Sequence, residues 1–94
     1  MNISTEQLKQ IEKLAALFLS PEEIALKLRL DVKKFTKEVK RKNSEVNIAF
    51  ETGNLDSEIE IRDQIVKMAK LGNPQAQTLT VKYIQHQKMK EKLG

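Results

Sequence analysis

Apolar residues recur every three to four positions along most of the chain, and short polar stretches separate the runs. This spacing is the period of an α-helix that buries one face. Ser4 with Gln7, and Ser20 with Glu23, have the spacing of the capping boxes that begin helices. The pattern predicts an all-α protein with helices near residues 4–18, 21–29, 32–42, 45–52, 55–71 and 74–92.

The first three predicted helices are expected to form a three-helix unit over residues 1–44 that contains a helix-turn-helix. Between Ser20 and Lys42, a short helix, a tight turn and a strongly basic helix follow one another, as in the motif that places a helix in the major groove of DNA. Arg29 stands where glycine is usual in such turns, so we expect a slightly different or longer turn. The residues expected in the core are Leu8, Ile11, Leu14, Ala15, Phe18, Ile24, Leu28, Phe35 and Val39.

The third predicted helix has a strongly basic outer face. Residues 33–42 include six lysines and arginines and one acid, Glu38. Such a stripe is typical of a surface that contacts phosphates, although a lysine-rich solvated face has the same composition. Thr36 lies among the lysines and is the better candidate for touching a base edge. The predicted DNA-binding residues, expected to point outward, are Val32, Lys33, Thr36, Lys37, Lys40 and Arg41.

Residues 45–94 are expected to form a helical region for oligomerisation or partner binding. Asn43 has low helix propensity, so a break or bend is expected near it. Gly53 is expected to end the short helix that follows as its C-cap, and Asn54 to cap the next helix.

The last two predicted helices are expected to form a hairpin. Gly72, Asn73 and Pro74 give a helix stop, a cap and a helix start in succession, so the last helix should fold back antiparallel. The helix at 55–71 has more apolar positions than one neighbouring helix covers. A second copy of the chain would cover the remainder, which predicts a homo-oligomer; packing against the first three helices is the competing explanation.

The formal net charge of +4 is unevenly distributed. Residues 1–44 carry all of it, because residues 45–94 contain seven basic and seven acidic residues. Within that second region, residues 45–66 carry −5 and residues 67–94 carry +5. Opposite charges of this kind favour packing of one helix on another, within or between chains, although both sets also suit solvated faces.

The sequence offers little chemistry for an enzyme. It has no cysteine, no phosphate-binding glycine loop and a single histidine, His86, which is expected to be an exposed polar residue. No catalytic residue, metal site or cofactor is therefore predicted. The N-terminus lacks a signal pattern, and the longest apolar run, residues 14–19, is too short to cross a membrane. We expect a soluble, cytoplasmic protein without membrane contacts.

Several short motifs follow the predicted helix-turn-helix. They comprise Ala49, Phe50, Gly53, Arg62, Met68, Ala69, Gly72, Asn73, Gln77, Thr78, Lys82 and Tyr83. Together with the helix-turn-helix, these residues resemble the small terminase subunits of tailed bacteriophages and prophages. The resemblance implies recognition of double-stranded DNA at a packaging start site, oligomerisation through the region after the DNA-binding unit, and delivery of DNA to a large terminase subunit, an ATPase and nuclease. It also implies residence in the cytoplasm of a bacterial host cell.

Two other functions fit the same sequence. A transcriptional regulator would use the same helix-turn-helix, with RNA polymerase in place of a large terminase subunit. A helical adaptor that binds only protein would leave the basic face solvated, because a fold alone does not define a function.

Overall fold

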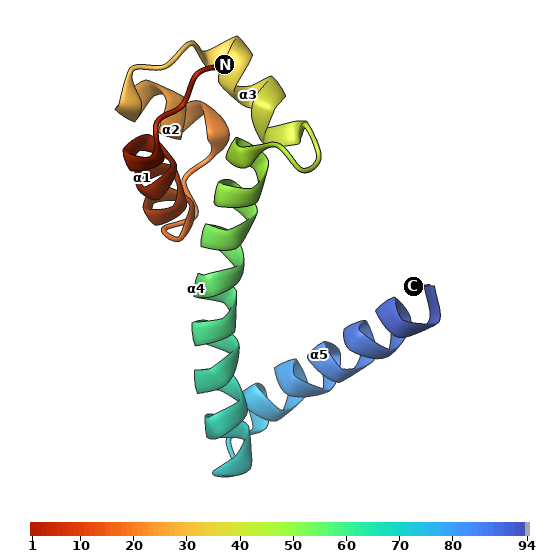
Figure 1. Cartoon of the computed structure of the whole chain (residues 1–94). Helices are drawn as coiled ribbons and strands as arrows, with labels where there is room; N and C mark the ends of the chain where they lie inside the picture. The colour runs from red at the N-terminus through yellow and green to blue at the C-terminus, as the bar shows by residue number, and fades with distance from the viewer. Residues whose placement is uncertain (94) are drawn as a thin grey trace. The chain divides into compact units, whose positions relative to one another are not determined.

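Every element of the protein is a helix over residues 1–93, the part of the chain that the computed structural model describes (Figure 1). The predicted all-α fold is therefore confirmed. The helices are α1 (Thr5–Ala15), α2 (Pro21–Leu28), α3 (Val32–Lys40), α4 (Glu45–Lys70) and α5 (Pro74–Leu93). The chain divides into two compact units, the first ending at Glu58 and the second beginning at Ile59.

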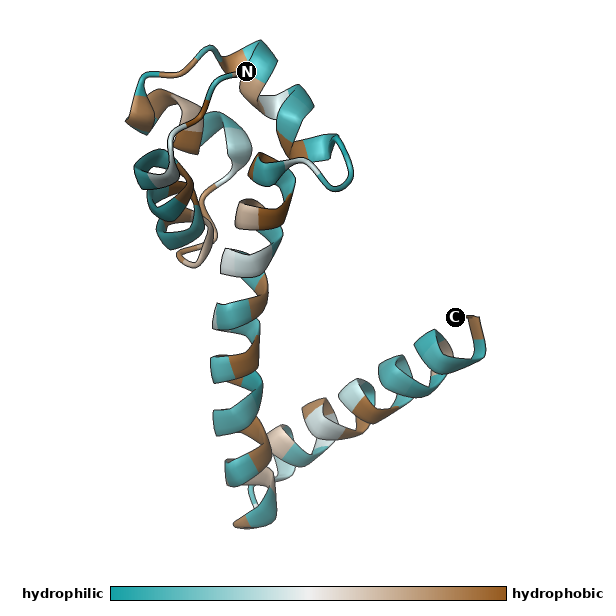
Figure 2. Ribbon diagram, in the orientation of Figure 1, coloured by the Kyte–Doolittle hydropathy of each residue, from teal (hydrophilic) through white to brown (hydrophobic). Residues whose placement is uncertain are grey.

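The core of the first unit is built from α1, α2, α3 and the beginning of α4. Figure 2 shows that apolar and polar residues alternate along each of these helices. Phe35 is fully buried and is the largest side chain of this core. The buried core residues are Ile11, Ala15, Ile24, Ala25, Phe35, Val39, Val46 and Ala49. All but one of the core residues predicted from the sequence lie in this cluster or pack against it; the exception is Phe18.

The starts of α1 and α2 lie where the sequence predicts them, because each is fixed by local hydrogen bonds. In α1 the amide of Gln7 donates to the Ser4 hydroxyl at 3.1 Å, and the Ser4 amide donates to the Gln7 side chain at 3.0 Å. Ser20 and Glu23 make the same reciprocal pair at the start of α2. Each pair satisfies two amide groups that a helix start otherwise leaves without partners.

The end of α1 differs from the prediction. The helix stops at Ala15 rather than near residue 18, and Phe18 adopts a left-handed backbone with φ 61° and a side chain that is 52% exposed. The expectation that Phe18 belongs to the core is therefore wrong. Two carbonyls at this end also accept hydrogen bonds from side chains of α4. Asn54 donates to the carbonyl of Ala15 at 2.7 Å, and the Ser57 hydroxyl donates to the next carbonyl.

Helix α4 is continuous where the sequence predicts two helices. Gly53 is buried inside it and does not cap a helix end, and Asn54 binds the end of α1 instead of starting a new helix. A Cβ atom on Gly53 would lie 2.9 Å from the Ala15 Cβ and closer still to the carbonyl oxygen of Glu12. The glycine therefore permits close packing of α1 on α4.

The turn between α2 and α3 is shorter and more regular than expected. Arg29 adopts the left-handed conformation, with φ 57° and ψ 43°, and the Leu30 amide donates to the Ala25 carbonyl at 2.8 Å. The chain thus makes the tight turn that glycine usually makes, and the prediction of a different or longer turn is wrong. A side chain in this conformation costs roughly 1–2 kcal/mol.

Replacing Arg29 by glycine is expected to increase the free energy of unfolding by about 0.5–1 kcal/mol, because relief of backbone strain exceeds the added freedom of the unfolded chain. Urea unfolding followed by circular dichroism measures the change. Arg29→Ala removes the same charge but keeps the strain, so it should give no gain. Equal stability of the two variants would show that the turn is unstrained.

The second unit contains the end of α4, a tight turn and α5. Gly72 has φ 98°, and the Asn73 side chain accepts from the Ala76 amide at 2.9 Å, so the predicted stop, cap and start are confirmed. Ala69 and Ala76 are buried beside this turn. Farther from it, the Arg62 guanidinium lies 4.8 Å from the centre of the Tyr83 ring, within the distance of a cation–π contact.

Candidate nucleic-acid interface

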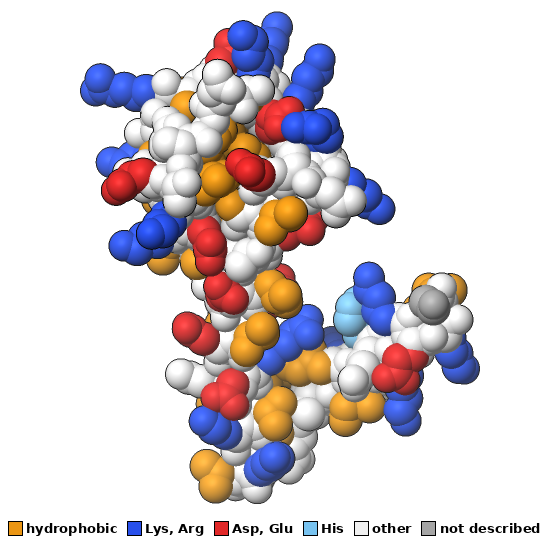
Figure 3. Space-filling view, in the orientation of Figure 1, with side chains coloured by type: hydrophobic (Ala, Val, Ile, Leu, Met, Phe, Trp, Pro, Cys, Tyr) orange, Lys and Arg blue, Asp and Glu red, His pale blue; other side chains and the backbone are white. Residues whose placement is uncertain are grey.

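Three lysines form one exposed stripe along α3. Lys33, Lys37 and Lys40 are spaced by four and three residues, so they fall within an arc of roughly 60° on the helix surface. Phe35 and Val39 lie on the opposite side and are buried. Figure 3 shows basic side chains crowding the end of the first unit that carries α3. Helix α3 is therefore amphipathic, with its apolar side chains in the core and the three lysines in solvent.

Both ends of α3 are fixed by side-chain hydrogen bonds. At its start, the Asp31 carboxylate accepts from the Lys34 amide at 2.9 Å. At its end, the Asn47 side chain donates to the Val39 carbonyl at 2.6 Å, and the Ser44 hydroxyl donates to the Glu38 carbonyl at 2.8 Å. These last two side chains are buried, so their bonds are shielded from water. The basic helix is therefore held firmly against the start of α4.

The sequence does not predict the junction between α3 and α4, which is formed by the hydrogen bonds of Ser44 and Asn47. Low helix propensity is the obvious property of Ser44, yet its hydroxyl accepts from the Asn47 amide at 3.0 Å and caps α4. The signal that could have found the junction is a serine followed three residues later by a polar residue, which is a capping pattern. The predicted break at Asn43 is confirmed, because that residue has φ 67° between the two helices.

Val32 does not point freely outward. It is half-buried and packs against the core of the first unit, so the prediction of an outward side chain is corrected. The reason is its place at the first turn of α3, where the helix begins beside the end of α2. Covering the core removes the apolar surface of this side chain from water, which stabilises the folded protein.

Thr36 is half-buried, and its hydroxyl is used within α3. It donates to the backbone carbonyls of Val32 at 2.9 Å and Lys33 at 3.1 Å. Threonine often makes such bonds to the preceding turn of its own helix.

Arg41 is exposed but already has a partner. Its Nε donates to Glu38 Oε1 at 3.0 Å and its Nη2 to Glu38 Oε2 at 2.9 Å. The hydrogen bonds from Arg41 lower the pKa of the Glu38 carboxyl below its usual value. The same bonds raise the pKa of the Arg41 guanidinium. Both groups are therefore charged at neutral pH, and the fork of Arg41 is committed to this pair.

Lys34 and Lys42 add two exposed cations that belong to the basic run but not to the predicted DNA-binding residues. Lys34 lies to one side of the lysine stripe, since each residue turns the helix by about 100°. Lys42 follows the end of α3, in the turn before α4.

The other surfaces give no comparable arrangement. Within residues 1–93, no three acidic or histidine side chains are placed to hold a metal ion, and His86 is exposed on α5. One hollow of the first unit, about 450 Å³, is an open groove lined by Lys9, Glu12, Lys13, Ala16 and Asp56. Over the same residues, no helix combines the length and apolar character needed to cross a membrane.

The lysine stripe on α3 is thus the strongest candidate site of the first unit, and its geometry and charge are the basis for assigning a function. No family model, no curated protein and no solved structure matches the chain.

Proposed function

We propose that the protein binds double-stranded DNA through α3, with α2 and α3 forming a helix-turn-helix. The observation that carries the proposal is the exposed stripe of Lys33, Lys37 and Lys40 opposite the buried Phe35. None of these lysines is within ion-pair distance of a carboxylate among the described residues 1–93. Their charge is therefore available to phosphates, and the fixed ends of α3 reduce the entropy lost on binding.

Fluorescence anisotropy tests this proposal directly. A labelled duplex of about two helical turns is titrated with protein at several salt concentrations between about 50 and 200 mM. The logarithm of the binding constant should fall linearly with the logarithm of the salt concentration. If each stripe lysine neutralises one phosphate, the magnitude of this slope should be about 2.7 or greater. Absence of binding at the lowest salt would refute the proposed function.

We further propose that the protein acts as a small terminase subunit in phage-type DNA packaging. The support is the resemblance of its short motifs to that family, together with an unusual second unit. Only Ala69 and Ala76 are buried among residues 59–93, whereas many large apolar side chains are exposed. These exposed residues include Ile59, Ile61, Met68, Leu71, Leu79, Val81, Ile84 and Met89.

In this proposal α4 and α5 form a hairpin that assembles copies of the chain and contacts a large terminase subunit. Many large apolar side chains of this unit are exposed, and burying them between copies would contribute about 25 cal/mol per Å² of apolar surface. Several linked α3 helices would then bind DNA with avidity, so weak individual contacts suffice. The cytoplasm of a bacterial host cell is the compartment that fits this role.

Assembly is expected to depend on the exposed apolar residues of the second unit. The full chain should have a mass in light scattering that is a multiple of 10.8 kDa, and a double variant, Ile59→Glu with Val81→Glu, should return to one chain. A matched control, Gln64→Glu with Gln75→Glu, adds the same charge at exposed polar positions. A wild-type protein that remains one chain at high concentration would contradict the assembly.

The same exposed apolar surface also supports the second candidate, a helical adaptor that binds only protein. The anisotropy experiment separates the two, because an adaptor has no affinity for DNA at low salt. A transcriptional regulator would bind DNA as proposed and would differ in its protein partner, RNA polymerase.

A further inference from the structure

Base recognition in the major groove depends on a small set of side chains. Arginine binds guanine and asparagine or glutamine binds adenine through two hydrogen bonds, and each such pair gives about 1–3 kcal/mol of discrimination. Helix α3 has the sequence VKKFTKEVK and contains none of these residue types. Lysine also donates to guanine, but its flexible stem and single ammonium define a geometry less well than a planar fork does.

Thr36 is the only neutral polar residue on α3, and its donor is already in use. The hydroxyl hydrogen is shared by the carbonyls of Val32 and Lys33, at 2.9 and 3.1 Å. Donating to a base would require breaking these bonds inside the helix, which offsets the gain. Its methyl group can still touch a base, but a single apolar contact discriminates weakly.

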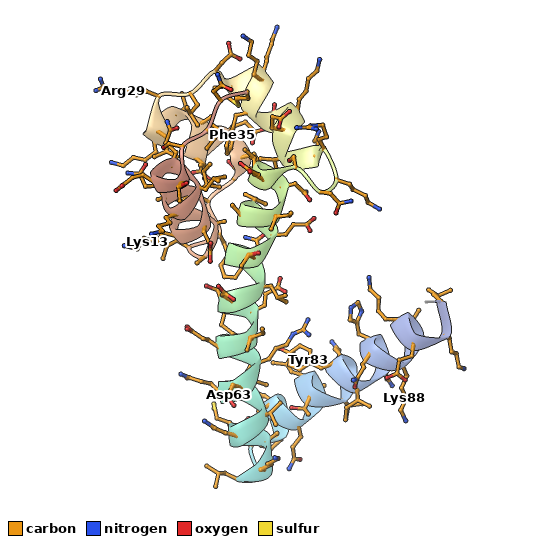
Figure 4. All side chains as sticks on the ribbon, in the orientation of Figure 1. Lys13, Arg29, Phe35, Asp63, Tyr83 and Lys88 are labelled. Atoms are coloured by element: carbon orange, nitrogen blue, oxygen red, sulfur yellow. The ribbon has the colours of Figure 1, made fainter. Side chains whose placement is uncertain are left out.

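The nearest guanidinium groups are also withheld from a base edge. Arg41 follows α3 directly and makes two hydrogen bonds to Glu38, at 3.0 and 2.9 Å. Its side chain is 66% exposed, but its donors bind a carboxylate of α3. Arg29, in the turn before α3, projects away from this helix (Figure 4).

We propose that α3 binds duplex DNA through its phosphates with little preference for sequence, and that Glu38 keeps Arg41 from adding a contact. This inference rests on the proposed DNA binding and defines its substrate class, which is duplex DNA of any sequence. The carboxylate occupies the place that a phosphate would take on the guanidinium. Glu38 thereby restrains affinity and keeps Arg41, the guanidinium that directly follows α3, from bidentate recognition of a base.

A set of duplexes of equal length tests the sequence preference. GC-rich, AT-rich and mixed duplexes compete for the full-length protein in fluorescence anisotropy at one salt concentration. The expected dissociation constants agree within about threefold, since α3 contains no arginine, asparagine or glutamine to make a well-defined bidentate base contact. A difference above tenfold would overturn the inference alone, whereas no binding to any duplex at low salt would overturn the proposed function and the inference with it.

The role of Glu38 is tested by releasing its partner. Glu38→Gln should bind DNA more tightly and steepen the salt dependence by about 0.9, the effect of one additional phosphate contact from Arg41. The Glu38 side chain is 19% exposed, and glutamine has nearly the same shape, so the variant is expected to keep its fold, which circular dichroism checks.

Two further variants separate release of Arg41 from simple loss of a negative charge. Arg41→Ala alone should leave the salt slope of the wild type unchanged. The double variant, Glu38→Gln with Arg41→Ala, also lacks the negative charge at position 38, but it has no guanidinium to release. Its salt slope should therefore be as shallow as that of the wild type. An unchanged slope in Glu38→Gln, or the same steepening in the double variant, would overturn the restraining role of Glu38.

Discussion

Replacing Lys33, Lys37 and Lys40 together by alanine is expected to reduce DNA affinity by some tens of fold and to lower the magnitude of the salt slope by about 2.7. The magnitude follows from counterion release, since each phosphate contact contributes about 0.9 to the slope. All three side chains are exposed on one face of α3, and alanine favours the helix, so the fold should remain intact. Fluorescence anisotropy between about 50 and 200 mM salt gives both quantities.

A matched control removes the same number of charges elsewhere in the first unit. Lys9, Lys13 and Lys27 are exposed on α1 and α2, and Lys13 lies well away from α3 (Figure 4). Their replacement by alanine should change the salt slope by less than about 0.9, the contribution of one phosphate contact. If both triple variants weaken binding equally, net charge rather than the α3 stripe determines affinity, and the proposed interface is wrong.

Replacing Gly53 by alanine is expected to lower the free energy of unfolding by about 2 kcal/mol or more, the usual cost of an overpacked contact. In an exposed helix interior the same change would stabilise the protein by about 1 kcal/mol, because glycine is a poor helix former. Here the added Cβ would lie 2.9 Å from the Ala15 Cβ and 3.0 Å from the carbonyl carbon of Glu12. The Glu12 atom belongs to a helix backbone, so relief requires α1 to move away from α4.

Urea unfolding measures this loss, and Asp56→Ala is the control within the same helix. Asp56 is exposed on α4, so its replacement should leave stability unchanged or raise it slightly. A Gly53→Ala variant that is as stable as the wild type would show that α1 and α4 do not approach as closely as described.

Features set by neighbouring residues are predictable from the sequence, whereas features set by distant ones are not. The helix starts at Ser4 and Ser20 depend on residues three positions away, so their capping boxes are visible in the sequence. The end of α1 is formed locally, by the left-handed backbone of Phe18 and the bonds of the Phe18 and Leu19 amides to Ala15 and Leu14. The further hydrogen bond from Asn54, 39 residues later, is indicated by no local pattern. The prediction for Gly53 is wrong for the same reason, since low helix propensity is a local property but the close contact with α1 is not.

The candidate site follows the same division. The spacing of Phe35, Val39 and the lysines is sufficient to predict the exposed stripe from the sequence alone. The pairing of Arg41 with Glu38 is also a local signal, a three-residue spacing on a helix surface, although charge counting alone does not reveal it. The junction through Asn47 depends on the path of the chain around Asn43, because the Asn47 side chain reaches back eight residues to a carbonyl of α3.

The hydrogen bonds from Asn54 and Ser57 to the end of α1 have a consequence for the order of folding. These partners are separated by 39 and 41 residues, so the carbonyls of Ala15 and Ala16 gain these two side-chain donors only after α4 has docked. Loop closure over that distance must precede the contact, which slows its formation relative to the local capping boxes. Amide hydrogens at the end of α1 and in this part of α4 should consequently exchange with solvent in one cooperative opening.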